Sequence, residues 1–147
     1  LFRSNRKLDL YKIVFPEKVK AATSILERAG RVFMDLRAWY LGSQSEQERQ
    51  ELLRARNDVL WTAKAHEGLL GSTISELSSR FRIVCFDCFL QVPEFRKPAI
   101  LEGDSWAHEE AFQMLSAALR EAIHLPVFEC LLPQPVVVKR RRWFGKF

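Results

Sequence analysis

The chain has 147 residues, of which 48% are hydrophobic and 28% charged, and its formal net charge is +5. This length corresponds to one ordinary domain, and the composition excludes an intrinsically disordered chain. No apolar run approaches the roughly 18 residues of a transmembrane helix. Three cysteines are too few for a disulfide scaffold, so a reducing, cytoplasmic setting fits best.

The positive charge is concentrated at the two ends of the chain. Residues 139–147 contain five basic residues and no acidic one, which leaves 18 basic against 18 acidic residues in the remainder. The first twelve residues are basic as well, with Asp9 set against Arg3, Arg6, Lys7 and Lys12. The middle of the chain is mildly acidic, which argues against a nucleic-acid-binding face on the folded core.

Residues 1–15 form a basic and apolar opening segment that is followed by a proline. The residue before a proline is biased away from helical dihedral angles, so we expect a break or kink at Phe15. Pro16 then suits the first position of a helix, where its missing N–H has no partner to lose.

Residues 16–40 carry the clearest helical pattern in the chain. Apolar residues follow one another at spacings of three and four, which is typical of one buried face on a long α-helix. The stripe consists of Ala22, Ile25, Ala29, Val32, Leu36 and Trp39, widened by Leu26, Phe33 and Tyr40.

A second helix is predicted over residues 45–65. Gly42 is placed to end the first helix, and Ser45 is placed to cap the next one. The short connection makes the second helix an antiparallel neighbour of the first.

Residues 66–72 contain two glycines around Leu69–Leu70, which predicts a break whose leucines pack into the core. Thr73 followed by Glu76 has capping-box spacing and favours a third helix over residues 73–91. The alternative is one continuous helix that reaches Leu90, since the apolar spacing stays nearly in phase.

The last third of the chain is less regular. Residues 92–103 hold two prolines and are the best candidate for a functional loop, although such a loop is equally often a plain crossover. Asp104 or Ser105 is expected to cap a fourth helix that ends near His124. Three prolines exclude a helix over residues 125–135, and residues 136–138 are expected to be extended chain.

These elements predict an all-α fold, an antiparallel helical bundle of about four main helices with an irregular, proline-containing C-terminal segment. The bundle domain is expected to cover residues 16–132, and residues 133–147 are expected to form an extended basic and aromatic tail.

Cys85 and Cys88 form a C-x-x-C pair late in the third predicted helix. With His124 and Cys130 they would make a Cys₃His zinc set, and a redox role is a further alternative. Zinc-binding pairs usually occupy a tight turn, whereas free cysteine behaves as a small apolar residue. We therefore favour core packing for both thiols and predict no metal.

No catalytic constellation is visible in the sequence. The three histidines, His66, His108 and His124, are scattered, and structural or solvent-facing roles are expected for each. A Ser-His-Asp set, a glycine-rich phosphate loop and a metal-binding H-E-x-x-H are all missing from the chain. We predict no catalytic residue and no cofactor, so a non-enzymatic role is favoured over an enzymatic one.

The C-terminal tail is the sharpest local signal. It combines consecutive basic residues with aromatic ones, and its candidate contact residues are Lys139, Arg140, Arg141, Arg142, Trp143, Phe144 and Lys146. Such a tail can bind an anionic membrane surface, or it can bind nucleic-acid phosphates with its aromatics stacked on bases. A solvated terminus with its aromatics folded onto the helices is the third possibility.

The opening residues Arg3, Arg6, Lys7 and Tyr11, followed by Glu17–Lys18–Val19–Lys20–Ala21, resemble the soluble part of small bacterial membrane-anchored proteins of unknown function. A second helix, the Leu69–Leu70 break and a capped helix at Thr73 extend the resemblance over roughly residues 10–90. The chain departs from that group at Phe15–Pro16, in the 92–103 loop and in its tail. The resemblance implies a membrane-tethered helical module with no known reaction.

We expect a non-enzymatic protein-interaction or scaffold module, tethered to or touching the cytoplasmic face of a membrane. The tether would be an apolar span upstream of Leu1, oriented by the basic residues that follow it. A nucleic-acid-associated protein that uses the tail is the alternative, and a metal-binding protein is a weaker one. Neither the protein partner nor the oligomeric state is indicated by the sequence.

Overall fold

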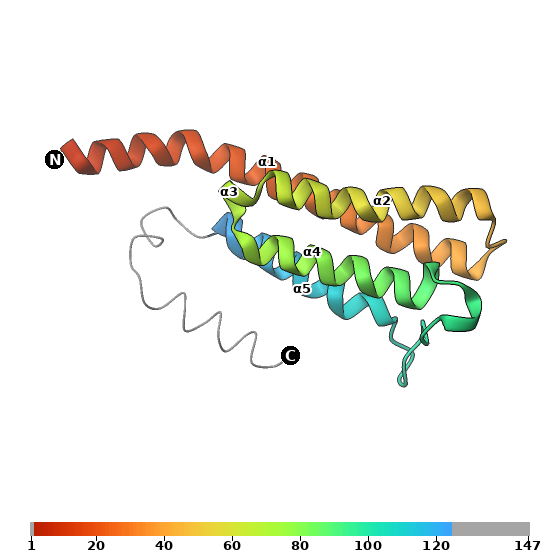
Figure 1. The fold of residues 1–147 in the computed structure, drawn as a ribbon. Coiled ribbons are helices and arrows are strands. Elements are labelled where there is room, and N and C mark those ends of the chain that lie inside the picture. The colour runs from red at the N-terminus through yellow and green to blue at the C-terminus, as the bar shows by residue number, and fades with distance from the viewer. Residues whose placement is uncertain (1, 125–147) are drawn as a thin grey trace.

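The computed structural model describes residues 2–124, which form an antiparallel bundle of helices (Figure 1). The predicted all-α class is confirmed. The long helices are α1 (Phe2–Leu41), α2 (Glu46–Ala65), α4 (Ser72–Cys85) and α5 (Ala107–His124). Three short elements connect them: α3 (Glu67–Leu70), the π-helix η1 (Phe86–Leu90) and the 3-10 helix η2 (Pro93–Phe95).

The four long helices alternate in direction, so each is antiparallel to the two that it packs against. Helix α1 lies beside α2 and α5, and α4 lies beside the same two helices. The turn between α1 and α2 and residues 86–106 lie together at what we call the loop end. Helix α1 projects from the opposite end, where α5 stops at His124, and we call this the basic end (Figure 1).

The core is built on the predicted stripe of α1. Its six central residues are all buried: Ala22, Ile25, Ala29, Val32, Leu36 and Trp39. The partly buried Leu26, Phe33 and Tyr40 pack against the same core, as expected. Each fully buried large apolar side chain contributes about 1.5–3 kcal/mol to stability, so this stripe supplies much of the stability of the bundle.

The predicted break at Phe15 is wrong, because α1 runs without interruption from Phe2 to Leu41 with Pro16 inside it, whereas the alternative, a kink, stays a prediction. A proline within a helix removes the hydrogen bond to the carbonyl four residues earlier, here that of Lys12, and destabilises the helix by about 3 kcal/mol. Both Pro16 and Lys12 are exposed, so water can hydrate the released carbonyl. Residues 2–15 therefore continue the helix past the bundle.

The turn between α1 and α2 matches the expected caps in part. The Ser45 hydroxyl accepts a hydrogen bond from the Glu48 N–H at 3.2 Å, so the predicted N-cap is confirmed. Gly42 follows the end of α1, where a Cβ would approach the Ala38 carbonyl oxygen to 2.9 Å. The residue with a positive φ in this turn is Gln44, at 50°.

The break at residues 66–72 is confirmed, but the predicted cap is not. Leu70 is buried and Leu69 packs partly against the core, so the leucines contribute to the core as expected. Helix α4 begins at Ser72 after Gly71, whose φ of 92° only glycine adopts without strain. This glycine sets the start of the helix, and the capping box expected at Thr73 is not formed.

The fourth long helix starts later than predicted. Asp104 has a φ of 62° and lies in the preceding turn, and α5 begins at Ala107. Ala111 and Ala118 of this helix are buried. Residues 125–147, which include Cys130, the rest of the proline-containing segment and the whole basic tail, lie outside the described residues.

Replacing Ile25 by Asp is expected to unfold the bundle, because it buries an uncompensated charge in the centre of the α1 stripe. The expected loss of unfolding free energy exceeds about 4 kcal/mol. Urea unfolding followed by circular dichroism measures it. Met34→Asp is the matched control, since Met34 lies on the same helix and is 60% exposed. If the Ile25→Asp variant unfolded cooperatively and with the stability of the wild type, the core would have to lie elsewhere.

Candidate functional site

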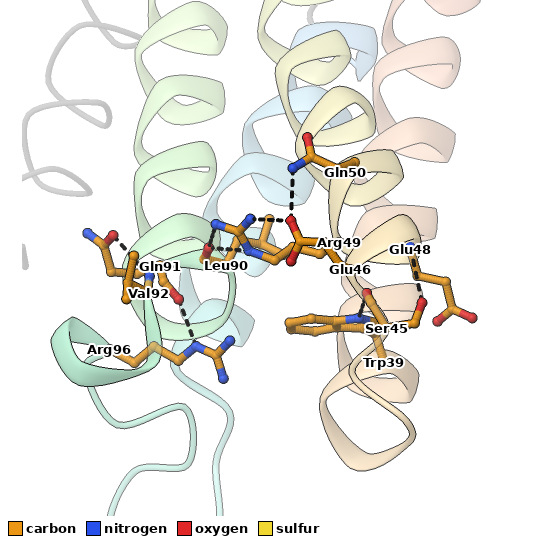
Figure 2. A network of polar contacts seen from close by, with 10 residues as sticks. All are labelled: Trp39, Ser45, Glu46, Glu48, Arg49, Gln50, Leu90, Gln91, Val92 and Arg96. Atoms are coloured by element: carbon orange, nitrogen blue, oxygen red, sulfur yellow. Dashed lines mark hydrogen bonds and ion pairs between the residues drawn. The ribbon is translucent and has the colours of Figure 1, made fainter.

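The loop end is held together by arginines that donate to backbone carbonyls. Arg49 on α2 reaches the last residue of η1, where its Nε and Nη2 donate to the Leu90 carbonyl oxygen at 3.0 and 2.6 Å (Figure 2). Its Nη1 also pairs with Glu46 at 3.1 Å. Because hydrogen bonds from a charged donor contribute about 1.5–3 kcal/mol, Arg49 firmly connects the first turn of α2 to the end of η1.

A second arginine fixes the segment that follows η1. The Nε of Arg96 donates to the Gln91 carbonyl oxygen at 2.9 Å (Figure 2), and its Nη1 donates to the Gln44 side chain at 3.2 Å. The guanidinium lies 5.5 Å from the centre of the Trp39 ring, whose own N–H donates to the Ser45 carbonyl oxygen. Residues 91–96 are thereby attached to the α1–α2 turn.

The rest of the predicted functional loop closes on itself. Ile100 and Trp106 form an isolated antiparallel bridge, and the Ala107 N–H donates to the Ala99 carbonyl oxygen at 2.8 Å. The tight turn between them requires a φ of 90° at Gly103. The loop therefore has its own hydrogen-bonded structure and is more than an irregular connection between two helices.

This loop presents an apolar surface, which we call the loop patch. It consists of Val92, Phe95, Ile100 and Leu101, all of them exposed. Phe95 is the most exposed, at 72%. Four large apolar side chains are thus exposed on one short loop, and exposed apolar surface that gathers in one region of a protein is typical of interaction sites.

A hollow adjoins the loop patch. It has a volume of about 300 Å³ and is lined by Trp39, Arg49, Val92, Pro93 and Arg96, together with Gln44 and Glu46. A larger hollow of about 540 Å³ lies between α1 and α2, where three carboxylates, of Asp35, Glu48 and Glu51, contribute to its wall. The first hollow offers aromatic and guanidinium groups beside an exposed apolar loop.

His108 lies in an aromatic cluster between α1, η1 and α5. Its side chain is completely buried, with the Phe33 ring centre 4.4 Å away and the Phe89 ring centre 4.5 Å away. Its Nε2 lies 3.3 Å from the Phe33 carbonyl oxygen. A carbonyl can only accept, so Nε2 carries the proton and Nδ1, which is buried without a partner, keeps its lone pair.

This environment keeps the imidazole neutral. The pKa of His108 is lowered from its ordinary 6.5 to about 4, mainly by burial and in a smaller part by the charge of Arg37, while the hydrogen bond to the Phe33 carbonyl opposes the shift. A protonated Nδ1 would have no acceptor among the surrounding rings. His108 therefore has a structural role. The sequence allowed either a structural or a solvent-facing role for this histidine, and the structure shows that it is buried.

Cys85 and Cys88 are both buried at the junction of α4 and η1. Burial raises the pKa of each thiol, so both remain protonated near neutral pH. A protonated, buried thiol is a poor nucleophile and a poor metal ligand. Their environment agrees with the expected core packing.

The other members of the predicted zinc set are not brought to these cysteines. His124 is the last residue of α5, at the opposite end of the bundle from Cys85 (Figure 1), and Cys130 lies outside the described residues. Within residues 2–124, no three His, Cys, Asp and Glu side chains are grouped so that they could hold a metal ion. The same part of the chain contains no helix with the length and apolar character needed to cross a bilayer.

Sequence reasoning pointed to the 92–103 loop but missed the arginines that support it. Arg49 and Arg96 lie 47 positions apart in the sequence, and no local spacing relates them. The burial of His108 could have been found, because it lies three residues before the inward-facing Ala111 on the same helix. The candidate contact residues of 139–147 lie outside the described part of the chain.

Comparisons of this chain with protein-family models, with curated proteins and with solved structures found no match. The resemblance to small bacterial membrane-anchored proteins therefore stays a prediction, and the function has to be argued from the chain's own residues.

The free energy of unfolding of the bundle is expected to decrease as the pH is lowered from 6.5 to 4, because His108 must stay neutral when buried. Above pH 6.5 the imidazole is neutral in both states, whereas at lower pH the unfolded chain binds a proton that the folded state accepts only below pH 4. The expected loss is about 3 kcal/mol of unfolding free energy.

Urea unfolding at a series of pH values measures this effect. His108→Phe keeps a ring of similar size without a titrating group, so its stability should fall less over the same range. Equal pH dependence in the two proteins, or an NMR titration of His108 near its ordinary pKa, would contradict the assignment.

Proposed function

We propose that this chain is a non-enzymatic interaction module that contacts an anionic membrane surface with its basic end and a protein partner with its loop patch. The proposal rests on one observation, namely that the two ends of the bundle differ. The N-terminal part of α1 projects from one end, and the exposed apolar loop lies at the other (Figure 1).

Basic residues precede the bundle in the sequence and also follow it. Arg3, Arg6, Lys7 and Lys12 lie on the projecting part of α1. Helix α5 ends at His124 on the same side, and the basic residues of 139–147 follow it in the sequence. Each basic residue near an anionic membrane contributes about 1 kcal/mol of attraction, so the two segments would act together.

The loop patch suits a protein better than a membrane. Exposed acidic residues, Glu94, Glu102 and Asp104, lie on the same loop, and Lys97 pairs with Asp87 at 3.4 Å. These carboxylates would be repelled by anionic lipids. The complementary surface is an apolar pocket with a basic rim, into which Phe95 inserts as the anchor.

Binding of the full chain to anionic vesicles is expected to depend on the basic end. Changing Arg3, Arg6, Lys7 and Lys12 to Gln should weaken the binding more than about tenfold, because four attractive charges are removed. Vesicle co-sedimentation at low and high salt measures it.

The matched control changes to Gln four exposed basic residues that lie away from the basic end: Arg31, Arg54, Arg80 and Lys97. The control should bind nearly as well as the wild type. An equal loss of vesicle binding in both variants would contradict the proposal. It would also be contradicted if the wild-type chain bound single-stranded DNA but not vesicles.

A photo-crosslinking amino acid in place of Phe95 is expected to give a discrete protein adduct in cells, because this side chain is the anchor of the patch. The same amino acid in place of Trp61, which is 61% exposed on α2, should not give that adduct. Adding Ile100→Asp, a change at an exposed position, should abolish the adduct from position 95.

Three outcomes of the crosslinking experiment would count against a separate protein partner at the loop patch. These are identical adducts from both positions, no adduct from position 95, and an adduct that contains two copies of this chain.

A further inference from the structure

Two arginines meet at the seam between α2 and α4, beside the start of η1 and away from the basic end. Arg56 on α2 and Arg82 on α4 donate to the same atom, the Asn57 Oδ1, each from a nitrogen 3.2 Å away. Arg56 also donates to the Arg82 carbonyl oxygen at 3.4 Å. The two guanidinium groups therefore lie side by side, and we call them the arginine pair.

The arginine pair lacks a counter-charge among residues 2–124. Ion pairs in this part of the chain join Arg28 to Asp58, Arg49 to Glu46 and Lys97 to Asp87, and none of these includes Arg56 or Arg82. The single shared acceptor, an amide oxygen, is neutral. Two like charges are thus held together by an oxygen that compensates neither of them.

Hydrogen-bond donors without a partner also indicate that the arginine pair lacks an acceptor. The Nε atoms of Arg56 and Arg82 are both buried and have no hydrogen-bond partner. Burial lowers the pKa of Arg56, and the charge of Arg82 lowers it further. A guanidinium has no lone pair to accept with, so only an acceptor can satisfy these groups.

The position of the pair is fixed in advance of any ligand. The Arg56 guanidinium carbon lies 5.1 Å from the centre of the ring of Phe86, the first residue of η1, and this contact restrains the side chain. Both arginine side chains are half-buried, so their charges are only partly hydrated. Two pre-oriented, planar guanidinium groups match the oxygens of a phosphate group better than a monovalent halide.

We propose that the arginine pair is a binding site for an oxyanion of the phosphate class, contacted by the guanidinium groups of Arg56 and Arg82. The ligand would be a small soluble phosphate compound rather than a lipid headgroup, because the pair lies on the side of the bundle and not at the basic end. This site is independent of the proposed membrane and partner contacts.

The first test is an NMR titration of the full chain with inorganic phosphate, with chloride at equal ionic strength as the reference. The Nε–H signals of Arg56 and Arg82 report the site directly. We expect saturable shifts of both signals in phosphate and none in chloride, and a rise in the midpoint of thermal unfolding with phosphate. Failure of either signal to shift would overturn the proposal.

Variants separate this site from general electrostatic attraction. Arg82→Gln removes one guanidinium and should weaken phosphate binding about tenfold or more. Arg54→Gln is the matched control, because Arg54 is an exposed arginine on α2 and the change in net charge is the same. Equal weakening in both variants would show that phosphate responds only to net charge, which would overturn the site.

Asn57→Asp gives an independent test, since it places a carboxylate between the two guanidinium groups. We expect this variant to lose the phosphate response and to unfold at a higher temperature than the wild type in chloride. A lower unfolding temperature, or an unchanged phosphate response, would show that the pair is not short of negative charge and would overturn the proposal.

Discussion

The packing of one apolar stripe on α1 is the constraint on which the rest of the structure depends. Helix α1 is the longest element, and its buried residues contact both α2 and α5. Because the helix is continuous, it connects the loop end to the basic end. Each end can then carry its own surface without changing the core, which is compatible with the two separate contacts that we propose.

Polar contacts at the loop end complement this apolar core. Arg49 and Arg96 both donate to backbone carbonyls that follow or end a helix, where carbonyls lack partners within the helix. His108 also donates to a backbone carbonyl, that of Phe33 in the middle of α1, from inside the aromatic cluster. The loop that carries the loop patch is therefore held in place by hydrogen bonds. A surface that is already ordered loses less conformational entropy when it binds a partner.

The helices could be predicted from the sequence because their information is local. A spacing of three and four identified the stripe of α1, and Ser45 identified the start of α2. The remaining features depend on distant residues or on a balance of energies. The Pro16 prediction failed because the rest of a long helix outweighs one missing hydrogen bond, and the arginine pair joins two helices whose contact no single segment encodes.

The π-helix η1 has a consequence for how this loop tolerates change. Its hydrogen bond runs from the Gln91 N–H to the Phe86 carbonyl oxygen at 2.7 Å, which encloses one residue more than an α-helical turn. One residue corresponds to about 100° of rotation around a helix axis. Deleting a residue between Phe86 and Leu90 would leave α4 intact and still turn the following loop toward another side of the bundle. The length of this short segment, more than its composition, therefore sets the direction in which Phe95 faces.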